Sequence, residues 1–255
     1  MIGEIPWRAK LKAFGTHFLV SVLAFGAIIA LTITLWYPPP FFWIDGALHV
    51  TVLAAIVDIF AGPLLTFVVY RPKKPRLMMN LAVIAALQCA ALAWGVKTMY
   101  SQRPLVAAFV PLKENRFYPV TEAQLRAGQR PIEEVLALSR SRPALVFVEL
   151  PEDPAEAARV LGSHSLSVLR QSERFRAIGG ERLARLVSAS RTRKTYEVVI
   201  PSFATGIDRF VAAHGGNADA FAFIPLYGRF GYALLAISKA DGKLAGVVAK
   251  QIHLH

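Results

Sequence analysis

Three long stretches of the first hundred residues carry no charged side chain other than Asp58. These stretches are residues 13–44, 46–70 and 77–96. Each supplies the ~20 apolar residues that a helix needs to cross the ~30 Å hydrocarbon core of a bilayer. We therefore predict a transmembrane domain of residues 1–100 with three spanning helices. They are expected at about residues 14–37, 47–70 and 77–96.

The pattern changes after residue 100, where short apolar runs alternate with polar segments. "RPLVAAFV" and "RPALVFVEL" predict strands, while "EDPAEAARVL" has acids in its first turn and a glycine after its end, as helices do. The end of the chain predicts one helix and then three strands joined by turns at residues 228–230 and 240–242. We predict that residues 101–255 form a small extracytoplasmic α+β domain whose antiparallel sheet is covered on one face.

Basic residues indicate the orientation of the helices. The N-terminal tail and the second loop are basic, whereas the first loop, "PPPFFWID", contains no Lys or Arg. The cations concerned are Arg8, Lys10 and Lys12 in the tail and the topology anchors Arg71, Lys73, Lys74 and Arg76 in the second loop. Lys and Arg beside a span favour the cytoplasm, so we expect the N-terminus inside and the C-terminal domain in the periplasm of a Gram-negative cell. The expected location is the bacterial inner membrane.

Aromatic residues gather at the predicted outer face of the membrane. We interpret them as an interfacial belt. They are Trp36, Tyr37, Phe41, Phe42, Trp43, Trp94 and Tyr100.

Composition agrees with a membrane protein and argues against a nucleic-acid partner. The chain is 55% hydrophobic with a net charge of +12. Residues 1–100 hold 8 Lys and Arg against 3 Asp and Glu, and residues 101–255 hold 21 against 14. The first excess follows from topology, and the second is explained at least as well by anionic lipid headgroups as by a polyanion. Cys89, the single cysteine, lies in the third predicted helix, so the C-terminal domain has no disulfide.

The second predicted helix carries a stripe of small and polar residues. The stripe consists of Thr51, Ala54, Ala55, Asp58, Ala61, Gly62 and Thr66, opposite the bulky Val52, Ile56, Phe60, Leu64 and Phe67. An ionised carboxylate at mid-membrane costs at least about 2.5 kcal/mol, so Asp58 is expected to face protein. Small faces pack helices closely, whereas bulky faces meet lipid.

Pro63 adds a local defect to this helix. It cannot donate to the carbonyl of Ile59, so we expect a kink or an opening one turn beyond Asp58. Gln88 lies at a similar depth and could serve the Asp58 carboxyl or a freed carbonyl, while His17 and Asn80 share a depth nearer the cytoplasm. Three interpretations stay open: polar contacts that fix a three-helix bundle, a docking face for another protein's helix, or a proton or ion relay.

The sequence offers little catalytic chemistry. It contains no phosphate-binding loop, nucleophile elbow or CxxC pair, and its histidines lack metal-ligand spacing except for His253 and His255 on the tail. The densest basic run of the C-terminal domain, residues 190–195, is expected to be a solvated loop, with headgroup or acidic-partner contact as the alternative. We expect no enzyme activity, cofactor, metal or small-molecule substrate.

Several blocks of the sequence resemble a known family. They include "LWYPPPFFWIDG", "VDIFAGPLLTFVVYRPKK", "LMMNLAVIAALQCAALAWGVKTMYSQRP" and "PLYGRFGYALLAISKADGKLAGVV". These blocks resemble, in order, the TfpX/TfpZ family of type IV pilin accessory proteins, which includes FimB-like proteins. The resemblance implies an inner-membrane protein that helps a particular pilin be assembled into, or retracted from, a type IV pilus.

Other classes of function remain open at this point. The main alternative is a membrane-anchored extracytoplasmic sensor or ligand-binding protein, although short inner segments offer a sensor no output domain. A transporter would call for inverted repeats and more intramembrane polar groups. A membrane enzyme would call for clustered catalytic groups at one depth.

Overall fold

The computed structural model describes residues 6–72, 75–111, 115–162 and 165–252. Contacts divide the chain into two compact units. The helical unit comprises Met1–Trp36 and Ala47–Tyr100, and the sheet unit comprises Tyr37–Gly46 and Ser101–His255. The segment between the first two long helices, residues 37–46, therefore folds with the C-terminal part of the chain.

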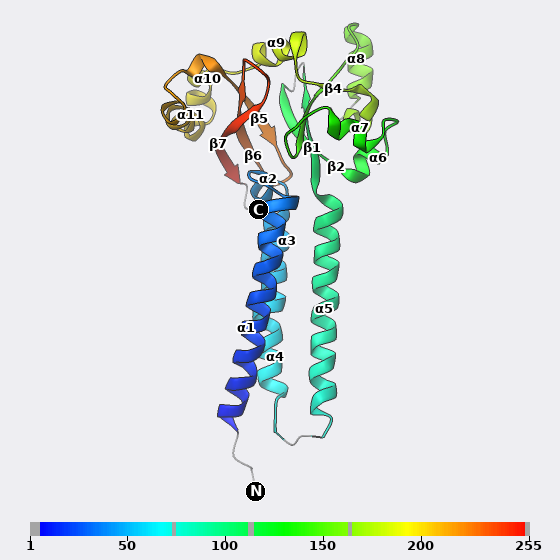
Figure 1. Ribbon diagram of the computed structural model, residues 1–255, viewed down its shortest axis with the longest axis vertical. Helices are drawn as coiled ribbons and strands as arrows, with labels where there is room; N and C mark the ends of the chain where they lie inside the picture. Colours follow the sequence, from blue (N-terminus) through cyan, green and yellow to red (C-terminus); the bar gives the residue numbers. More distant parts are fainter. Residues whose placement is uncertain (1–5, 73–74, 112–114, 163–164, 253–255) are drawn as a thin grey trace. The chain divides into compact units, whose positions relative to one another are not determined.

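Three helices of the described residues are long and apolar enough to cross a membrane, as predicted. The first runs through α1 (Trp7–Leu31) and a π-helical turn, η1 (Thr32–Trp36). The second runs through α3 (Ala47–Ala55), the π-helical segment η2 (Ile56–Ala61) and α4 (Gly62–Val69), and the third is α5 (Leu77–Gln102). Figure 1 shows α1 lying along the second helix, and α1 and α4 make the main contact of this unit.

Aromatic rings join α1 to α4. The ring of Phe67 lies 6.0 Å from that of Trp7 and 6.2 Å from that of Phe14. Phe67 was predicted on the bulky, lipid-facing side of the second helix, and this is only partly so, because the half-buried ring contacts α1. The ring reaches sideways to α1, because residues at the edge of a helical stripe can turn toward either neighbour.

The sheet unit contains one seven-stranded sheet in the order β4-β3-β1-β2-β5-β6-β7. Its strands are β1 (Pro104–Val110), β2 (Arg116–Thr121), β3 (Ala144–Val148), β4 (Phe175–Ala177), β5 (Phe221–Tyr227), β6 (Gly231–Ser238) and β7 (Leu244–Ile252). The last three strands form the antiparallel meander that the sequence predicts.

The prediction of a purely antiparallel sheet is wrong, because the sheet is mixed. Strand β1 pairs parallel with β3, and β2 pairs parallel with β5. The chain leaves β2 through α6 (Glu122–Arg126) and α7 (Ile132–Ala137) and returns at the far edge of β1 rather than beside β2. The connection through α6 and α7 brings β3 back in the same direction as β1. Parallel neighbours cannot be joined by a hairpin and need a longer crossover connection.

Helices cover the sheet and complete its core (Figure 1). They are α8 (Pro154–Leu161), α9 (Gly180–Ser188), α10 (Arg193–Val199) and α11 (Pro201–Ala213), with the short α2 (Phe41–Ile44) and the 3-10 turns η3 (Ser165–Arg170), η4 (Ser172–Arg174) and η5 (Ala218–Ala220). One core cluster joins β1 and β3 to α6 and α7, and a second joins β5 and β6 to α10 and α11. Every residue of β3 is buried, so both faces of the sheet are covered at this strand and the prediction of a sheet covered on one face is wrong there.

Residues 37–46 are anchored in the sheet unit by backbone and side-chain contacts. Ile44 is completely buried, and its carbonyl accepts a 2.8 Å hydrogen bond from the backbone N–H of Phe230. A methyl group at Gly228 would overlap the same carbonyl, so only glycine permits this approach. The Lys250 ammonium lies 3.6 Å from the ring centre of Trp43. The segment is thereby joined to the β5–β6 turn and to β7.

The predicted aromatic belt is only partly present. Tyr37, Phe41 and Phe42 are buried inside the sheet unit, whereas Trp94 is exposed. Large aromatic side chains suit a protein core as well as a membrane interface, and the anchoring of Ile44 brings these three into the core.

A buried carboxylate lies at the end of the anchored segment. The side chain of Asp45 is 1% exposed, and its Oδ1 lies 3.8 Å from Nε of Arg229. Burial raises the pKa of Asp45 from 3.8 to about 7, and the charge and backbone hydrogen bond of Arg229 oppose the rise. Burial raises the pKa of the neighbouring Tyr37 hydroxyl, and the charge of Asp45 raises it further.

The Asp45 pKa predicts pH-dependent opening of residues 37–46. Between about pH 4 and 7 the folded state keeps a proton that the unfolded state releases, so the free energy of opening falls as the pH rises through this window. After correction for intrinsic rates, hydrogen exchange in residues 37–46 should be at least about tenfold faster at pH 8 than at pH 5. In the variant Asp45→Asn this extra pH dependence should disappear. An identical pH profile in both proteins would contradict the prediction.

Candidate functional site

The second long apolar helix opens at Asp58. The backbone N–H of Gly62 donates to the carbonyl of Val57, five residues earlier, and residues 56–61 form the π-helical segment η2. The opening was expected one turn beyond Asp58 and instead includes it. Pro63 removes a donor and crowds the carbonyl four residues before it, so the relaxation falls on the N-terminal side of the proline.

Gln88 of α5 lies against this opening. Its Nε2 donates to the backbone carbonyl of Asp58 over 3.4 Å, which is one of the two roles foreseen for it. The Gln88 amide also occupies the space above Gly62, where a methyl group would overlap it. The glycine therefore lets α5 reach the backbone of the second helix.

Two polar side chains of α1 bind α4, the C-terminal half of the second helix. Nδ1 of His17 lies 2.6 Å from Oγ1 of Thr66, so the partner of His17 is Thr66 and not Asn80, which shares only its predicted depth. Nζ of Lys10 donates to the carbonyls of Phe67 and Val68 over 3.0 and 3.1 Å and caps the end of α4. In the sequence Lys10 indicates only topology, and nothing in its local pattern distinguishes it from Lys12, which is exposed.

The predicted stripe is largely covered by the chain's own helices. Asp58, Gly62, Pro63 and Thr66 are buried, and Ala54 is half-buried. The opposite face, with Val52, Ile56, Phe60 and Leu64, is exposed. Of the topology anchors, Arg71 and Arg76 are exposed, while Lys73 and Lys74 lie outside the described residues. What stays open near Asp58 is a groove beside the stripe, between α1 and α5.

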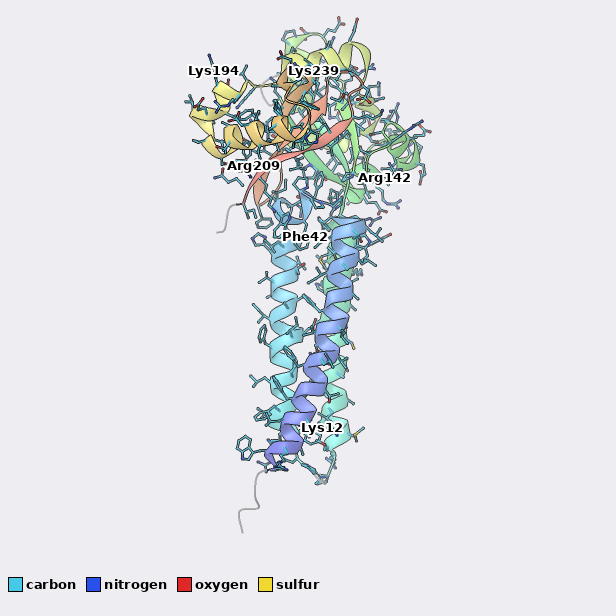
Figure 2. All side chains as sticks on the ribbon, turned by 60° about the vertical axis from the view of Figure 1, so that its left-hand side comes forward. Lys12, Phe42, Arg142, Lys194, Arg209 and Lys239 are labelled. Carbon is cyan, nitrogen blue, oxygen red and sulfur yellow. The ribbon has the colours of Figure 1, made fainter. Side chains whose placement is uncertain are left out.

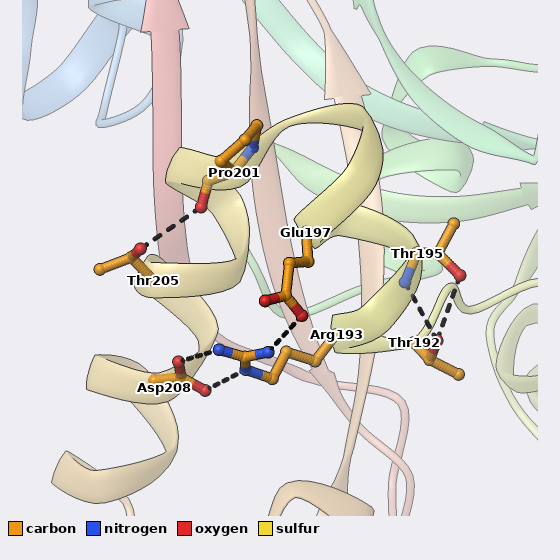
Figure 3. A network of polar contacts seen from close by, with 7 residues as sticks. All are labelled: Thr192, Arg193, Thr195, Glu197, Pro201, Thr205 and Asp208. Carbon is orange, nitrogen blue, oxygen red and sulfur yellow. Dashed lines mark hydrogen bonds and ion pairs between the residues drawn. The ribbon is translucent and has the colours of Figure 1, made fainter.

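The basic run of residues 190–195 is only partly the solvated loop that the sequence predicts. Thr192 caps α10, which begins at Arg193. The Arg193 guanidinium donates to both carboxylate oxygens of Asp208 over 2.6 and 2.8 Å and to Glu197 over 2.8 Å (Figure 3). The two acids lie on α10 and α11, so this arginine joins two helices and is not available to an acidic partner.

Basic side chains of the sheet unit are spread over several elements. Figure 2 labels Arg142 before β3, Lys194 on α10, Arg209 on α11 and Lys239 after β6. Among the described residues, no three His, Cys, Asp or Glu side chains are grouped so as to hold a metal ion. His164, His253 and His255 lie outside those residues.

Comparisons with known proteins assign the family. The sequence profile of "Fimbrial assembly protein FimB" matches residues 5–46, which comprise the first long apolar helix and the anchored segment. The fimbrial assembly protein of Dichelobacter nodosus serogroups C1 and C2 is 31% identical over 100 residues, which are 38% of this chain and 76% of the relative. The chain belongs to the FimB family of fimbrial assembly proteins.

Other FimB relatives match over a smaller share of their length. The fimbrial assembly protein of Dichelobacter nodosus serogroup E1 is 32% identical over 100 residues, 38% of this chain and 39% of the relative. The chain thus matches well under half the length of this relative. The names of these FimB proteins describe assembly and no reaction. No solved structure matches the chain.

The contact between Gln88 and Gly62 makes a testable prediction for this FimB protein. The variant Gly62→Ala should displace the Gln88 amide and lower the free energy of unfolding in detergent by up to about 2 kcal/mol, the range of intramembrane hydrogen bonds. In a Gln88→Ala background the same change should be neutral, or stabilising by up to about 1 kcal/mol through helix propensity. Gly95→Ala, which meets no atom within 4 Å, is the matched control. Equal losses in both backgrounds would show that another neighbour limits position 62.

Proposed function

We propose that the protein is an inner-membrane accessory protein of the type IV pilus that binds its cognate pilin and assists pilus assembly or retraction. Membership of the FimB family carries this proposal. It involves no catalysis and no cofactor. The protein acts by holding a pilin subunit within and beside the membrane.

The helical unit supports an action inside the bilayer. Its three helices expose long apolar faces, and its second helix combines a buried carboxyl, a proline and an open π-helical segment. A pilin that waits in the membrane as a single helix needs a partner at the same depth. Helix association in lipid depends on close packing and on hydrogen bonds, and this unit offers both.

The cation distribution supports the orientation. Arg71 and Arg76 are exposed between the second and third helices, whereas residues 37–46 contain no Lys or Arg. The N-terminus and this basic connection then lie in the cytoplasm and the sheet unit lies in the periplasm. A periplasmic sheet unit can contact the part of a pilin that projects from the membrane.

The function is tested by deletion and copurification in the source bacterium. Deleting the gene should reduce surface pili, and the tagged full-length protein should restore them and copurify with the pilin in mild detergent. An unrelated single-span membrane protein with the same tag is the control for copurification. Normal pili in the deletion strain together with no pilin in the purified complex would contradict the proposal.

The orientation is tested with reporter fusions after His255. Alkaline phosphatase should be active at that position and green fluorescent protein dark, because both reporters would be exported. The same reporters fused after Lys74 should show the opposite pattern. An active fluorescent fusion and an inactive phosphatase at His255 would overturn the orientation.

A further inference from the structure

A groove runs between α1 and α5 along the second helix. It consists of two adjoining hollows of about 640 and 210 Å³ that share His17, Val20 and Ala85. Small side chains line much of it, among them Ala13, Thr16, Ser21 and Ala24. Small residues let the backbone of another helix approach closely.

Two hydrogen-bond acceptors in the smaller hollow lack donors. Asp58 lines this hollow and is only 6% exposed, and its carboxyl has no hydrogen bond or ion pair among the described residues. Oε1 of Gln88, which lines the same hollow, is also buried without a partner within that part of the chain. Even a protonated carboxyl, with its single donor, leaves at least one of these acceptor oxygens without a donor.

The surroundings restrict what can supply the missing donor. Lipid tails cannot donate a hydrogen bond, and an unsatisfied polar group in hydrocarbon is costly. The chain's own stripe is already covered by α1 and by Gln88. A further helix that enters the groove from the lipid side would supply the missing donor.

We infer that the groove between α1 and α5 docks the transmembrane helix of the pilin, which places a hydrogen-bond donor against Asp58 and Gln88. The docked helix has small residues on its groove-facing side and a hydroxyl, amide or amine group at the depth of Asp58. This inference rests on the proposed function and says where on this protein the pilin helix binds. It keeps Asp58 and Thr66 of the predicted stripe, which line the two hollows, and adds the open side between α1 and α5.

Site-specific photocrosslinking tests the groove in the full-length protein in cells that make the native pilin. The crosslinking residue replaces Val20 of α1 or Leu92 of α5, which both line the groove. Matched controls replace Val22 and Leu87, which are exposed on the same helices but do not line either hollow. Pilin adducts, identified by immunoblot and mass spectrometry, are expected at positions 20 and 92 and not at positions 22 and 87.

Variants at Asp58 test the donor. At equal membrane abundance, Asp58→Leu should reduce the pilin adducts at positions 20 and 92 by about three- to twentyfold, the range of intramembrane hydrogen bonds. Asp58→Asn keeps an acceptor and should retain most of the adducts. Asp58→Lys, which adds a charge, should lose them. Adducts that are insensitive to all three changes would overturn the role of Asp58.

Other occupants of the groove give distinct results. Adducts with a second copy of the chain would make the groove a self-interface, and adducts only between α1 and α5 would mean that the bundle closes on itself. Equal pilin adducts at groove and control positions would show undirected contact in lipid. Each of these outcomes overturns the groove, whereas copurification of pilin without groove adducts would leave the proposed function intact and direct the search to the sheet unit.

Discussion

A bilayer interior offers no hydrogen-bond donor, and this is the main constraint on three helices that are long and apolar enough to cross a membrane. Pro63 removes one backbone donor, so the helix before it relaxes into the wider turn of residues 56–61 and exposes polar backbone there. Gln88 donates a hydrogen bond to the carbonyl of Asp58. Thr66 is hydrogen-bonded to His17, and Lys10 caps the last carbonyls of α4. Each of these contacts satisfies a polar group that lipid would leave unpaired. The polar contacts between the three helices therefore satisfy groups that the second helix cannot satisfy by itself.

The same constraint connects structure with the proposed function. When the polar groups of a helix are all hydrogen-bonded within its own bundle, its outer surface resembles lipid and does not favour a particular partner helix. Here some hydrogen-bond acceptors lack donors on one side of the bundle, where Asp58 and Gln88 face a groove of small residues. On the proposed function, the protein binds a pilin helix in the membrane and later releases it. One or two modest hydrogen bonds combined with close packing suit such a temporary contact better than a large apolar interface.

Residues 37–46 show how the family's sequence pattern spans both units. The family match, residues 5–46, covers the first membrane helix and then the segment that is anchored in the sheet unit through Ile44, Trp43 and Asp45. Within the sheet unit, this segment is held by the β5–β6 turn and by β7. The raised pKa of the buried Asp45 makes the anchorage sensitive to the pH around it.

The sequence by itself determined what depends on neighbouring residues. Uncharged stretches predicted three long helices, the acids and Gly162 placed the helix α8, and glycines placed the turns of the last three strands. The tertiary structure decided which of these elements meet. It set β3 parallel to β1, buried Tyr37 and Phe42 in the sheet unit, paired His17 with Thr66, and joined Arg193 to Asp208. Helix length and turn chemistry follow from side chains a few positions apart, whereas these pairings join residues 15 to more than 100 positions apart and arise only when the whole chain packs.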